Sequence, residues 1–323
     1  MRCVTFNGTG GNEVVGVESR EDPVPGKFEL LIATEYAAVN PADVLQREGR
    51  HPPPPGAPAD IPGLEVAGTV VARGEAATSF QIGDRVFGLV GGGGLADRVV
   101  AHERELAHVP ATLDERGAAA APEAFLTAFD AICVQAGLGA GDTLLVNGAN
   151  GGVGTAAVQL ASAIGARVVA SVRATDRRDD VAALGATALA PEQAFERVRE
   201  LGGADTILEL VGGVNMTQNL SSLAMSGTLI VVAAKPGDEV TLALRELMSR
   251  RARIVATTLR RRPLEQKATL VQQFARRVVP LLGERRVTPI IDRVFDISDA
   301  TAALDFIRAP GKLGKVLLRT AVA

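Results

Sequence analysis

The chain has 323 residues, enough for two domains of ordinary size, and 47% of them are hydrophobic while 22% are charged. Its net charge is −3 without a sustained basic run, which argues against nucleic acid or an anionic membrane as the main partner. Because no apolar stretch is long enough to span a bilayer and the first residues lack a signal-peptide pattern, we expect a cytoplasmic location.

The first part of the chain, to about residue 118, has the pattern of a β-rich domain, with short apolar runs at 29–34, 67–72 and 98–101 separated by glycine and proline. From about residue 123, helices alternate with fully apolar strands, which we predict at 143–147, 167–172, 187–190, 205–211, 228–234 and 254–259. This alternation predicts an α/β fold with a doubly wound, mostly parallel sheet. Two further strands, at 291–295 and 316–319, indicate a return to the first domain.

The segment 147–154, with the sequence NGANGGVG, joins the strand at 143–147 to a helix-like run. In this context, backbone N–H groups and a helix N-terminus can hold a pyrophosphate. Glycines at 151 and 152 would let the backbone approach the phosphates, and Gly154 would let the helix pack closely. Because Ala149 replaces the first glycine of the usual motif, a tight turn in a nucleotide-free protein is the alternative. The predicted cofactor contacts are Asn150, Gly151, Gly152 and Val153.

The end of the next strand distinguishes the two nicotinamide cofactors. In NAD-binding versions this strand ends in a carboxylate that binds the ribose 2′-hydroxyl. Here Ser171 and Arg173 follow the strand out, then Arg177 and Arg178, with no carboxylate at the strand end. Such donors suit a 2′-phosphate, so we predict NADPH, with Ser171, Arg173 and Arg178 as contacts. Alternatively, the arginines only solvate the start of a helix.

Three later strands also end in small residues that would let a dinucleotide approach the carboxyl edge of the sheet. Each of these strand ends could equally be an ordinary loop start. The predicted contacts are Val211, Gly212, Ala233, Ala234, Thr258 and Leu259.

Possible metal ligands are few and scattered. The two cysteines, Cys3 and Cys133, are far apart, and His51, His102 and His108 show no metal-ligand spacing. A zinc site needs several such groups to converge. We therefore expect no metal centre and interpret both cysteines as buried apolar side chains.

Short motifs along nearly the whole chain resemble one known family, the zinc-free quinone oxidoreductases of the medium-chain dehydrogenase/reductase superfamily. In order, they are NPAD at 40–43, PGLEVAG at 62–68, GDRV at 83–86, TAF at 127–129, GANGGVG at 148–154, LGA at 184–186, VGG at 211–213, LR at 259–260 and GKV at 314–316. Each motif alone is weak, but their order and spacing are highly specific.

The resemblance implies a GroES-like, β-rich catalytic domain formed by residues 1–122 and 260–323. A Rossmann NADPH-binding domain at 123–259 would be inserted between these two parts. The resemblance also implies a homodimer without zinc. Zinc-dependent relatives supply a ligand from a Gly-His-Glu stretch, and here the same place has Leu64, which has no ligating atom.

The activity implied by the resemblance is hydride transfer from NADPH to a small-molecule acceptor, a quinone or an α,β-unsaturated carbonyl compound. The family residue matching Asn40 lies beside the nicotinamide and the substrate carbonyl, where an amide can donate to developing negative charge. Thr127 matches a contact of the nicotinamide end. For the substrate, Arg47 is a candidate contact of an anionic or thioester group. His51 is a candidate replacement for one of the tyrosines that quinone-reducing members carry at 45 and 51.

Each of these residues also has a structural explanation. Asn40 precedes Pro41 in a turn, Thr127 would pack inside a helix, and Arg47 and His51 would be exposed in a loop. We interpret at least two of the arginines at 260–262 as solvated. Two other functions stay open: an enoyl-thioester reductase of the same superfamily, favoured by the missing tyrosines, and a non-catalytic NADPH-binding structural or sensor protein.

Overall fold

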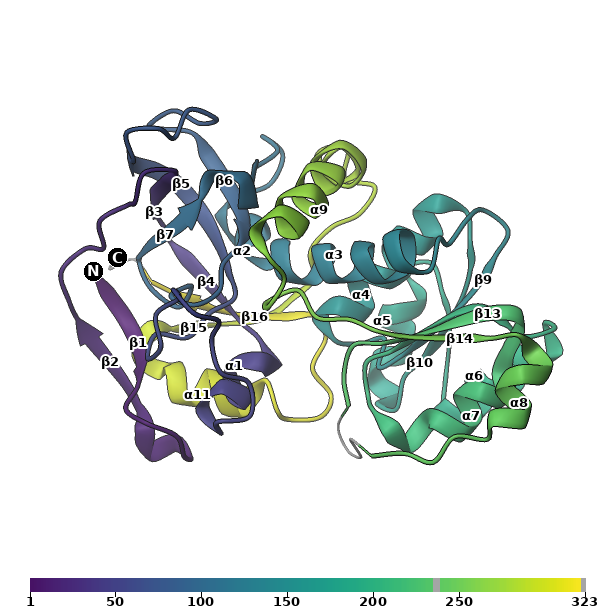
Figure 1. Ribbon diagram of the computed structural model, residues 1–323. Helices are drawn as coiled ribbons and strands as arrows, with labels where there is room; N and C mark the ends of the chain where they lie inside the picture. Colours follow the sequence, from purple (N-terminus) through teal and green to yellow (C-terminus); the bar gives the residue numbers. More distant parts are fainter. Residues whose placement is uncertain (235–238, 321–323) are drawn as a thin grey trace. The chain divides into compact units, whose positions relative to one another are not determined.

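The computed structural model describes residues 1–234 and 239–320, and the chain divides into two compact units. The first unit consists of Met1–Leu126 and Leu259–Ala323, and the second of Thr127–Thr258. The second unit is therefore inserted in the sequence of the first (Figure 1). The boundaries expected from sequence, after residues 122 and 259, lie beside these breaks. No helix in the described residues is long and apolar enough to cross a membrane.

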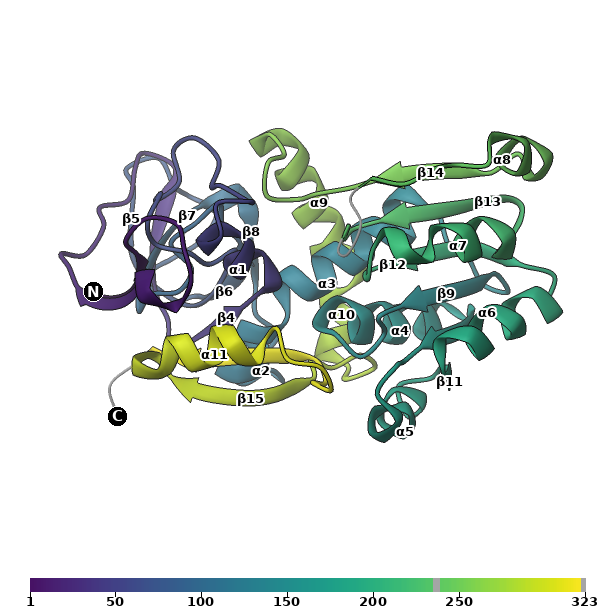
Figure 2. The same cartoon turned by 90° about the horizontal axis from the view of Figure 1, so that it is seen from below.

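In the part of the chain that the structure describes, the second unit is built on a six-stranded parallel sheet. Its strands are β9 (Thr143–Asn147), β10 (Arg167–Ser171), β11 (Thr187–Leu189), β12 (Ala204–Glu209), β13 (Leu223–Val231) and β14 (Arg253–Ala256). Across the described sheet their order is β11-β10-β9-β12-β13-β14, so the order reverses between β9 and β12 (Figure 2). This confirms the predicted doubly wound sheet, in which ligands bind at the carboxyl ends of the strands beside the reversal.

Of the six predicted strands, only 143–147 has the observed limits; the other five differ by one or more residues, with the largest differences at β13 and β14. β13 begins at Leu223 rather than at 228; the apolar pattern that predicted it is interrupted at exposed Met225 and Ser226, and Ser226 has a φ of 64°. The same strand ends at Val231, and β14 ends at Ala256. Consequently the predicted contacts at 233–234 and 258–259 lie just beyond the strands rather than within them.

The described helices of the second unit include the π-helix η3 (Phe129–Gln135), α4 (Gly152–Ile164), α5 (Arg178–Ala182), α6 (Pro191–Glu200), α7 (Met216–Ser222) and α8 (Leu244–Arg250). Helix α3 (Pro122–Ala128) crosses the boundary between the units. Helix α4 follows the glycine turn directly. A Cβ atom on Gly154 would lie 2.6 Å from the carbonyl oxygen of Gly148, so only glycine lets the helix pack this closely on the turn.

The described residues of the first unit form three sheets, so this unit is rich in strands, as predicted. A five-stranded antiparallel sheet has the order β7 (Arg98–His102), β3 (Glu29–Ala33), β5 (Glu65–Arg73), β6 (Arg85–Leu89) and β8 (Leu106–His108), and β1 (Arg2–Phe6) pairs with β2 (Val15–Ser19). In the third sheet, β16 (Lys315–Arg319) lies between β15 (Ile291–Asp296) and β4 (Tyr36–Val39). The predicted return of the tail is thus confirmed, with the yellow strands of Figure 1 joined to an N-terminal strand.

Helices close the cores of these sheets. They are α1 (Pro41–Arg47), α2 (Glu115–Ala120), α9 (Leu264–Arg277), α10 (Val279–Gly283) and α11 (Ala300–Phe306). One buried hydrophobic cluster is formed largely by side chains of the five-stranded sheet and includes Leu30, Ile32 and Val70. A second cluster joins Val39 of β4 and Val316 of β16 to α11. This second core fixes the junction of β4 and β16, where the candidate active-site residues lie.

Candidate active site and cofactor site

Asn40 occupies the junction between β4 and α1. It is the residue before the helix, and Pro41 takes the first helical position, where its missing N–H is not needed. The backbone N–H of Asn40 donates to Oδ2 of Asp43 at 2.7 Å, and the N–H of Gly63 donates to Oδ1 at 2.9 Å. Burial raises the pKa of Asp43 to about 6, against the effect of these two bonds. Asp43 thus joins the start of α1 to the loop that precedes Glu65.

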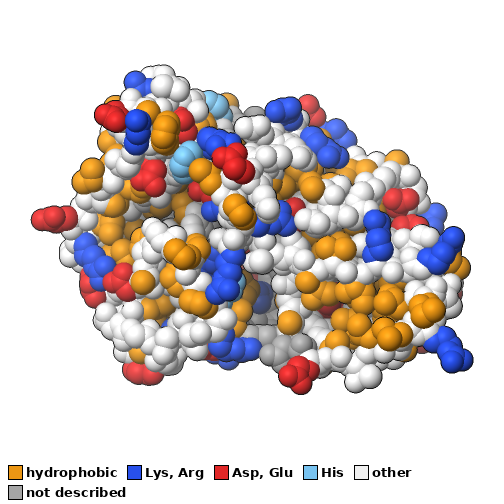
Figure 3. Space-filling model, in the orientation of Figure 1, with side chains coloured by type: hydrophobic (Ala, Val, Ile, Leu, Met, Phe, Trp, Pro, Cys, Tyr) orange, Lys and Arg blue, Asp and Glu red, His pale blue; other side chains and the backbone are white. Residues whose placement is uncertain are grey.

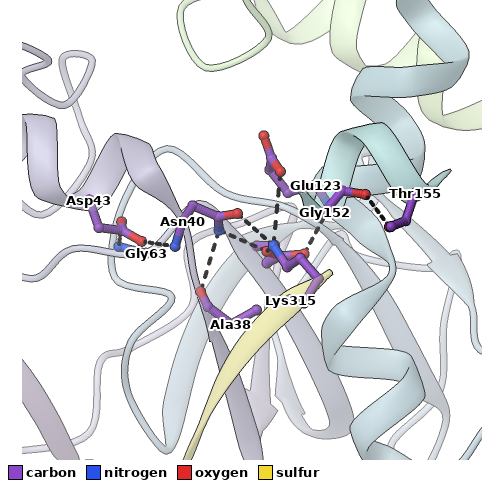
Figure 4. A network of polar contacts seen from close by, with 9 residues as sticks. Ala38, Asn40, Asp43, Gly63, Glu123, Gly152, Thr155 and Lys315 are labelled. Carbon is purple, nitrogen blue, oxygen red and sulfur yellow. Dashed lines mark hydrogen bonds and ion pairs between the residues drawn. The ribbon is translucent and has the colours of Figure 1, made fainter. Parts of the chain in front are cut away.

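The carboxamide of Asn40 is 2% exposed and is held at both ends. Its Nδ2 donates to Oε1 of Glu65 at 2.8 Å and makes a longer contact of 3.4 Å with the carbonyl oxygen of Ala38. Its Oδ1 accepts from Nζ of Lys315 at 2.5 Å (Figure 4). Because an ammonium group can only donate, Lys315 fixes which end of the amide carries the oxygen. The amide group therefore has one defined orientation.

A buried ion pair supports this amide. Nζ of Lys315 lies 2.7 Å from Oε1 of Glu65, and the two side chains are 4% and 1% exposed. The other oxygen of Glu65 accepts from the backbone N–H of Glu123 at 2.8 Å, and Oε2 of Glu123 lies 3.9 Å from Nζ. Such a pair is tolerated in the interior only when its remaining polar atoms are also bonded, as they are here. Sequence reasoning missed Glu65 and Lys315 as site residues, although each is a charged residue beside an apolar run.

Arg47 and His51, the two residues predicted for substrate binding, differ in how deeply they are buried. Arg47 is the last residue of α1 and is 3% exposed, with its Nη1 donating to Oδ1 of Asn12, so it is not a solvated loop residue. His51 is half-buried. Burial and the charges of Arg260 and Arg261 lower the pKa of His51, which favours the neutral imidazole near pH 7.

Arg260 holds the segment that carries His51. Its guanidinium is buried and donates to the carbonyl oxygens of Gly91 and His51, at 2.8 and 2.9 Å, and to Oε1 of Gln46 at 2.5 Å. Of the three consecutive arginines, Arg261 is exposed, but Arg260 is part of the interior. Burial also lowers the pKa of Arg260.

The glycine turn forms an open cradle in the second unit. Gly151 is the N-cap of α4 and supplies no side-chain cap to the first turn of the helix. A Cβ atom on Gly151 would have only the carbonyl oxygen of Gly148 nearby, at 3.7 Å, so the backbone is accessible there. Asn150, Gly152 and Val153 adjoin it. An uncapped helix N-terminus beside accessible backbone fits a pyrophosphate group.

The end of β10 provides basic and hydroxyl groups beside this cradle. Ser171 is its last residue, and its carbonyl oxygen accepts from the N–H of Ala149 in the turn. The side chain of Arg173 is exposed. Arg178 donates to the carbonyl oxygen of Val172 at 3.1 Å, whereas Arg177 is paired with Asp176 and Asp180. Ser171 thus joins the end of β10 to the glycine turn, and Arg173 follows that strand by two residues.

The remaining predicted cofactor contacts follow β12, β13 and β14. The backbone N–H groups of Val211 and Gly212 donate to the carboxylate of Glu209, a fully buried residue that sequence reasoning did not select. Ala233 and Ala234 follow the end of β13, and Thr258 follows the end of β14. Because the strands are parallel, these ends lie at the same edge of the sheet. Leu259 is buried, and Thr127 is a buried residue of α3. Within the described residues, no group of three or more His, Cys, Asp or Glu side chains could hold a metal ion.

Comparison with known proteins agrees with this architecture. Residues 26–111 match the family model described as alcohol dehydrogenase GroES-like domain, and residues 152–276 match that of zinc-binding dehydrogenase. A quinone oxidoreductase from Homo sapiens is 30% identical over 98% of this chain and 97% of its own length. The chain belongs to the quinone oxidoreductase family of the medium-chain dehydrogenase/reductase superfamily.

Two solved structures resemble this protein over nearly its whole length. An NAD-dependent alcohol dehydrogenase superposes with a TM-score of 0.88 at 27% identity, covering 99% of this chain and 100% of that one. A mycobacterial protein complexed with NADPH superposes with a TM-score of 0.86 at 28% identity and the same coverage. The quinone oxidoreductase family relationship and the Rossmann unit identify this protein as an oxidoreductase that uses a nicotinamide cofactor.

Proposed function

We propose that the protein is an NADPH-dependent reductase that transfers a hydride to a quinone or an α,β-unsaturated carbonyl acceptor without zinc. The observation that carries the cofactor choice is the end of β10, where Arg173 is exposed and residues 171–173 include no carboxylate. A carboxylate there would repel a 2′-phosphate, whereas a guanidinium group attracts one. The resemblance of the chain to quinone oxidoreductases supports the acceptor class.

In this proposal, residues of the second unit bind the cofactor and residues of the first unit bind the acceptor. When bound, the nicotinamide cofactor supplies the hydride. The glycine turn and the N-terminus of α4 would hold its pyrophosphate, and Ser171 and Arg173 its 2′-phosphate. In the first unit, the hydrogen of Asn40 Nδ2 that now makes the long 3.4 Å contact with Ala38 is the one available to the oxygen of an acceptor. It would stabilise negative charge as that oxygen gains it.

Lys315 would strengthen this role of Asn40. Its ammonium donates to the amide oxygen, and this withdraws electron density from the Nδ2–H groups and makes them better donors. The same ammonium already neutralises Glu65, and buried Leu64 offers no ligand atom. These two features support a mechanism in which hydrogen bonds, rather than zinc, polarise the acceptor.

We also propose that the protein forms a homodimer through the edge of the Rossmann sheet. Strand β14 is the last strand of that sheet, and an exposed strand edge favours pairing with another chain. Met225, Leu244 and Met248 on β13 and α8 are 58%, 63% and 75% exposed. Figure 3 shows hydrophobic side chains gathered over the part of the molecule that carries α7 and α8. Light scattering should give a dimer mass for the wild type and a monomer mass for Leu244→Asp.

The activity can be tested by the oxidation of NADPH and NADH in the presence of an ortho-quinone, a para-quinone, an alkenal and an enoyl thioester. We expect turnover with a quinone or the alkenal, a preference for NADPH, and no loss of activity after dialysis against a chelator. A preference for the thioester would instead identify an enoyl-thioester reductase. Binding of NADPH without turnover of any acceptor would overturn the proposed reductase and favour a non-catalytic binding protein.

A further inference from the structure

Glu209, the last residue of β12, is a buried carboxylate at the carboxyl edge of the Rossmann sheet. Its Oε1 accepts from the backbone N–H groups of Val211 and Gly212, at 2.7 and 2.9 Å. Its Oε2 accepts from Nδ2 of Asn147 and of Asn219, each at 2.8 Å. The Nδ2 of Asn215 lies 3.4 and 3.2 Å from the two oxygens. These donors to the anion are all neutral amide groups of the backbone or of asparagine.

The backbone of Glu209 extends these links to the neighbouring strand. Its carbonyl oxygen accepts from the N–H groups of Val232 and Ala233, which follow β13, at 3.1 and 3.3 Å. On the other side, its partner Asn147 is the last residue of β9 and leads into the glycine turn. One residue therefore joins the ends of three adjacent strands, β9, β12 and β13.

The loop after β12 needs such an anchor because its backbone is unusual. Gly212 has a φ of 145°, a conformation that residues with a side chain rarely adopt. A Cβ atom on Gly148 would lie 3.2 Å from Cγ2 of Val211, so this loop packs directly on the glycine turn. The Oδ1 atom of Asn147 is buried without a hydrogen-bond partner in the described residues, so Asn147 directs its two donor hydrogens into the network and leaves its acceptor unused.

The order of the strands indicates which part of a bound cofactor would lie near Glu209. The 2′-phosphate contacts follow β10 and the pyrophosphate cradle follows β9, so a dinucleotide crossing the sheet would place its nicotinamide half next to β12 and β13. We infer that Glu209 is a positioning residue that holds Val211 and Gly212 after β12, and Val232 and Ala233 after β13, in the conformation that binds the nicotinamide half. This inference rests on the nicotinamide cofactor of the proposed function, but not on its acceptor.

The test compares two ligands on the full chain. NADPH contains the nicotinamide half, whereas adenosine 2′,5′-bisphosphate represents only the half bound at β9 and β10. In Glu209→Gln, an amide NH₂ replaces one acceptor and faces donors in either orientation, so the network loses hydrogen bonds. We expect the Kd of NADPH to rise about tenfold or more, while the Kd of the bisphosphate changes by less than about twofold. Glu200→Gln, the same substitution on the exposed face of α6, is the matched control.

Equal weakening of both ligands would mean that Glu209 merely stabilises the unit, and unchanged NADPH binding would mean that it does not position the loop. Either result overturns the inference. Should Glu209→Gln fail to fold, Asn215→Ala removes only the longest contacts and should give a smaller loss that is again confined to NADPH. If the wild type prefers NADH, the same comparison uses NADH and ADP. A wild type that binds cofactor but reduces no acceptor refutes the proposed reductase and leaves this test intact.

Discussion

Nζ of Lys315 and Oε1 of Glu65 lie 2.7 Å apart inside the first unit, and both atoms also contact the amide of Asn40. The ion pair therefore does more than neutralise two buried charges. It presents a donor to the oxygen of the amide and an acceptor to its nitrogen, so the pair determines the orientation of the group that we propose for binding the acceptor.

Removing one partner of this pair should be costly. In Lys315→Met the carboxylate of Glu65 stays buried without its cation, and we expect the free energy of unfolding to fall by about 3–5 kcal/mol. Chemical denaturation would measure it. The double variant Lys315→Met/Glu65→Gln removes both charges of the pair and should recover most of the stability, but its kcat should stay at least about tenfold below wild type because Asn40 loses its defined orientation. Full recovery of kcat in the double variant would show that the pair is only structural.

Arg173 should decide the choice of cofactor. Arg173→Asp replaces the exposed guanidinium with a carboxylate, which should raise the Kd of NADPH by about ten- to a hundredfold and leave that of NADH nearly unchanged. Arg177→Asp is the matched control, because Arg177 is already paired with Asp176 and Asp180. Fluorescence titration with both cofactors would measure the effect. Equal losses for NADPH and NADH in Arg173→Asp would contradict the assignment of a 2′-phosphate site.

Arg260 should stabilise the segment that contains His51. Arg260→Met leaves the carbonyl oxygens of Gly91 and His51 and the amide oxygen of Gln46 without their donor, so we expect a loss of about 2–4 kcal/mol in unfolding free energy. The same change at exposed Arg261 should cost less than about 0.5 kcal/mol. If His51 contributes to acceptor binding, Arg260→Met should also raise KM for the acceptor more than for NADPH. Similar stabilities of the two variants would refute the structural role of Arg260.

The titration of Asp43 should make stability depend on pH. Its pKa is raised from 3.8 to about 6 by burial, so the folded protein binds the proton more tightly than the unfolded chain does. The stabilisation from this proton is complete below the unfolded pKa and is lost as the pH rises through about 6, with a total of about 3 kcal/mol. The advantage of the wild type over Asp43→Asn in unfolding free energy should therefore shrink between pH 4 and 6. A difference that is constant or grows over this interval would contradict the raised pKa.

The Rossmann sheet could be predicted from sequence because its strands are continuous apolar runs, and the predicted strand at 143–147 coincides with β9. The early start of β13 could not be predicted in this way, because Ser226 has a positive φ and no local sequence pattern indicates such a residue inside a strand. Asn40 could be named through its motif. Its partners were harder to recognise, since Glu65 and Lys315 lie 25 and 275 residues away in the chain and meet only through the pairing of β16 with β4. Glu209 was missed because one acidic residue at the end of an apolar strand has many possible roles.

The position of β16 has a consequence for synthesis on the ribosome. The strands of the Rossmann unit are contiguous in sequence, so that sheet can form as soon as β14 has emerged. Asn40 and Glu65 are made much earlier, but Lys315 follows Glu65 by 250 residues. Until then the nascent chain has a carboxylate without its counter-ion and an amide without its donor. The unit that is begun first is therefore the one that is finished last.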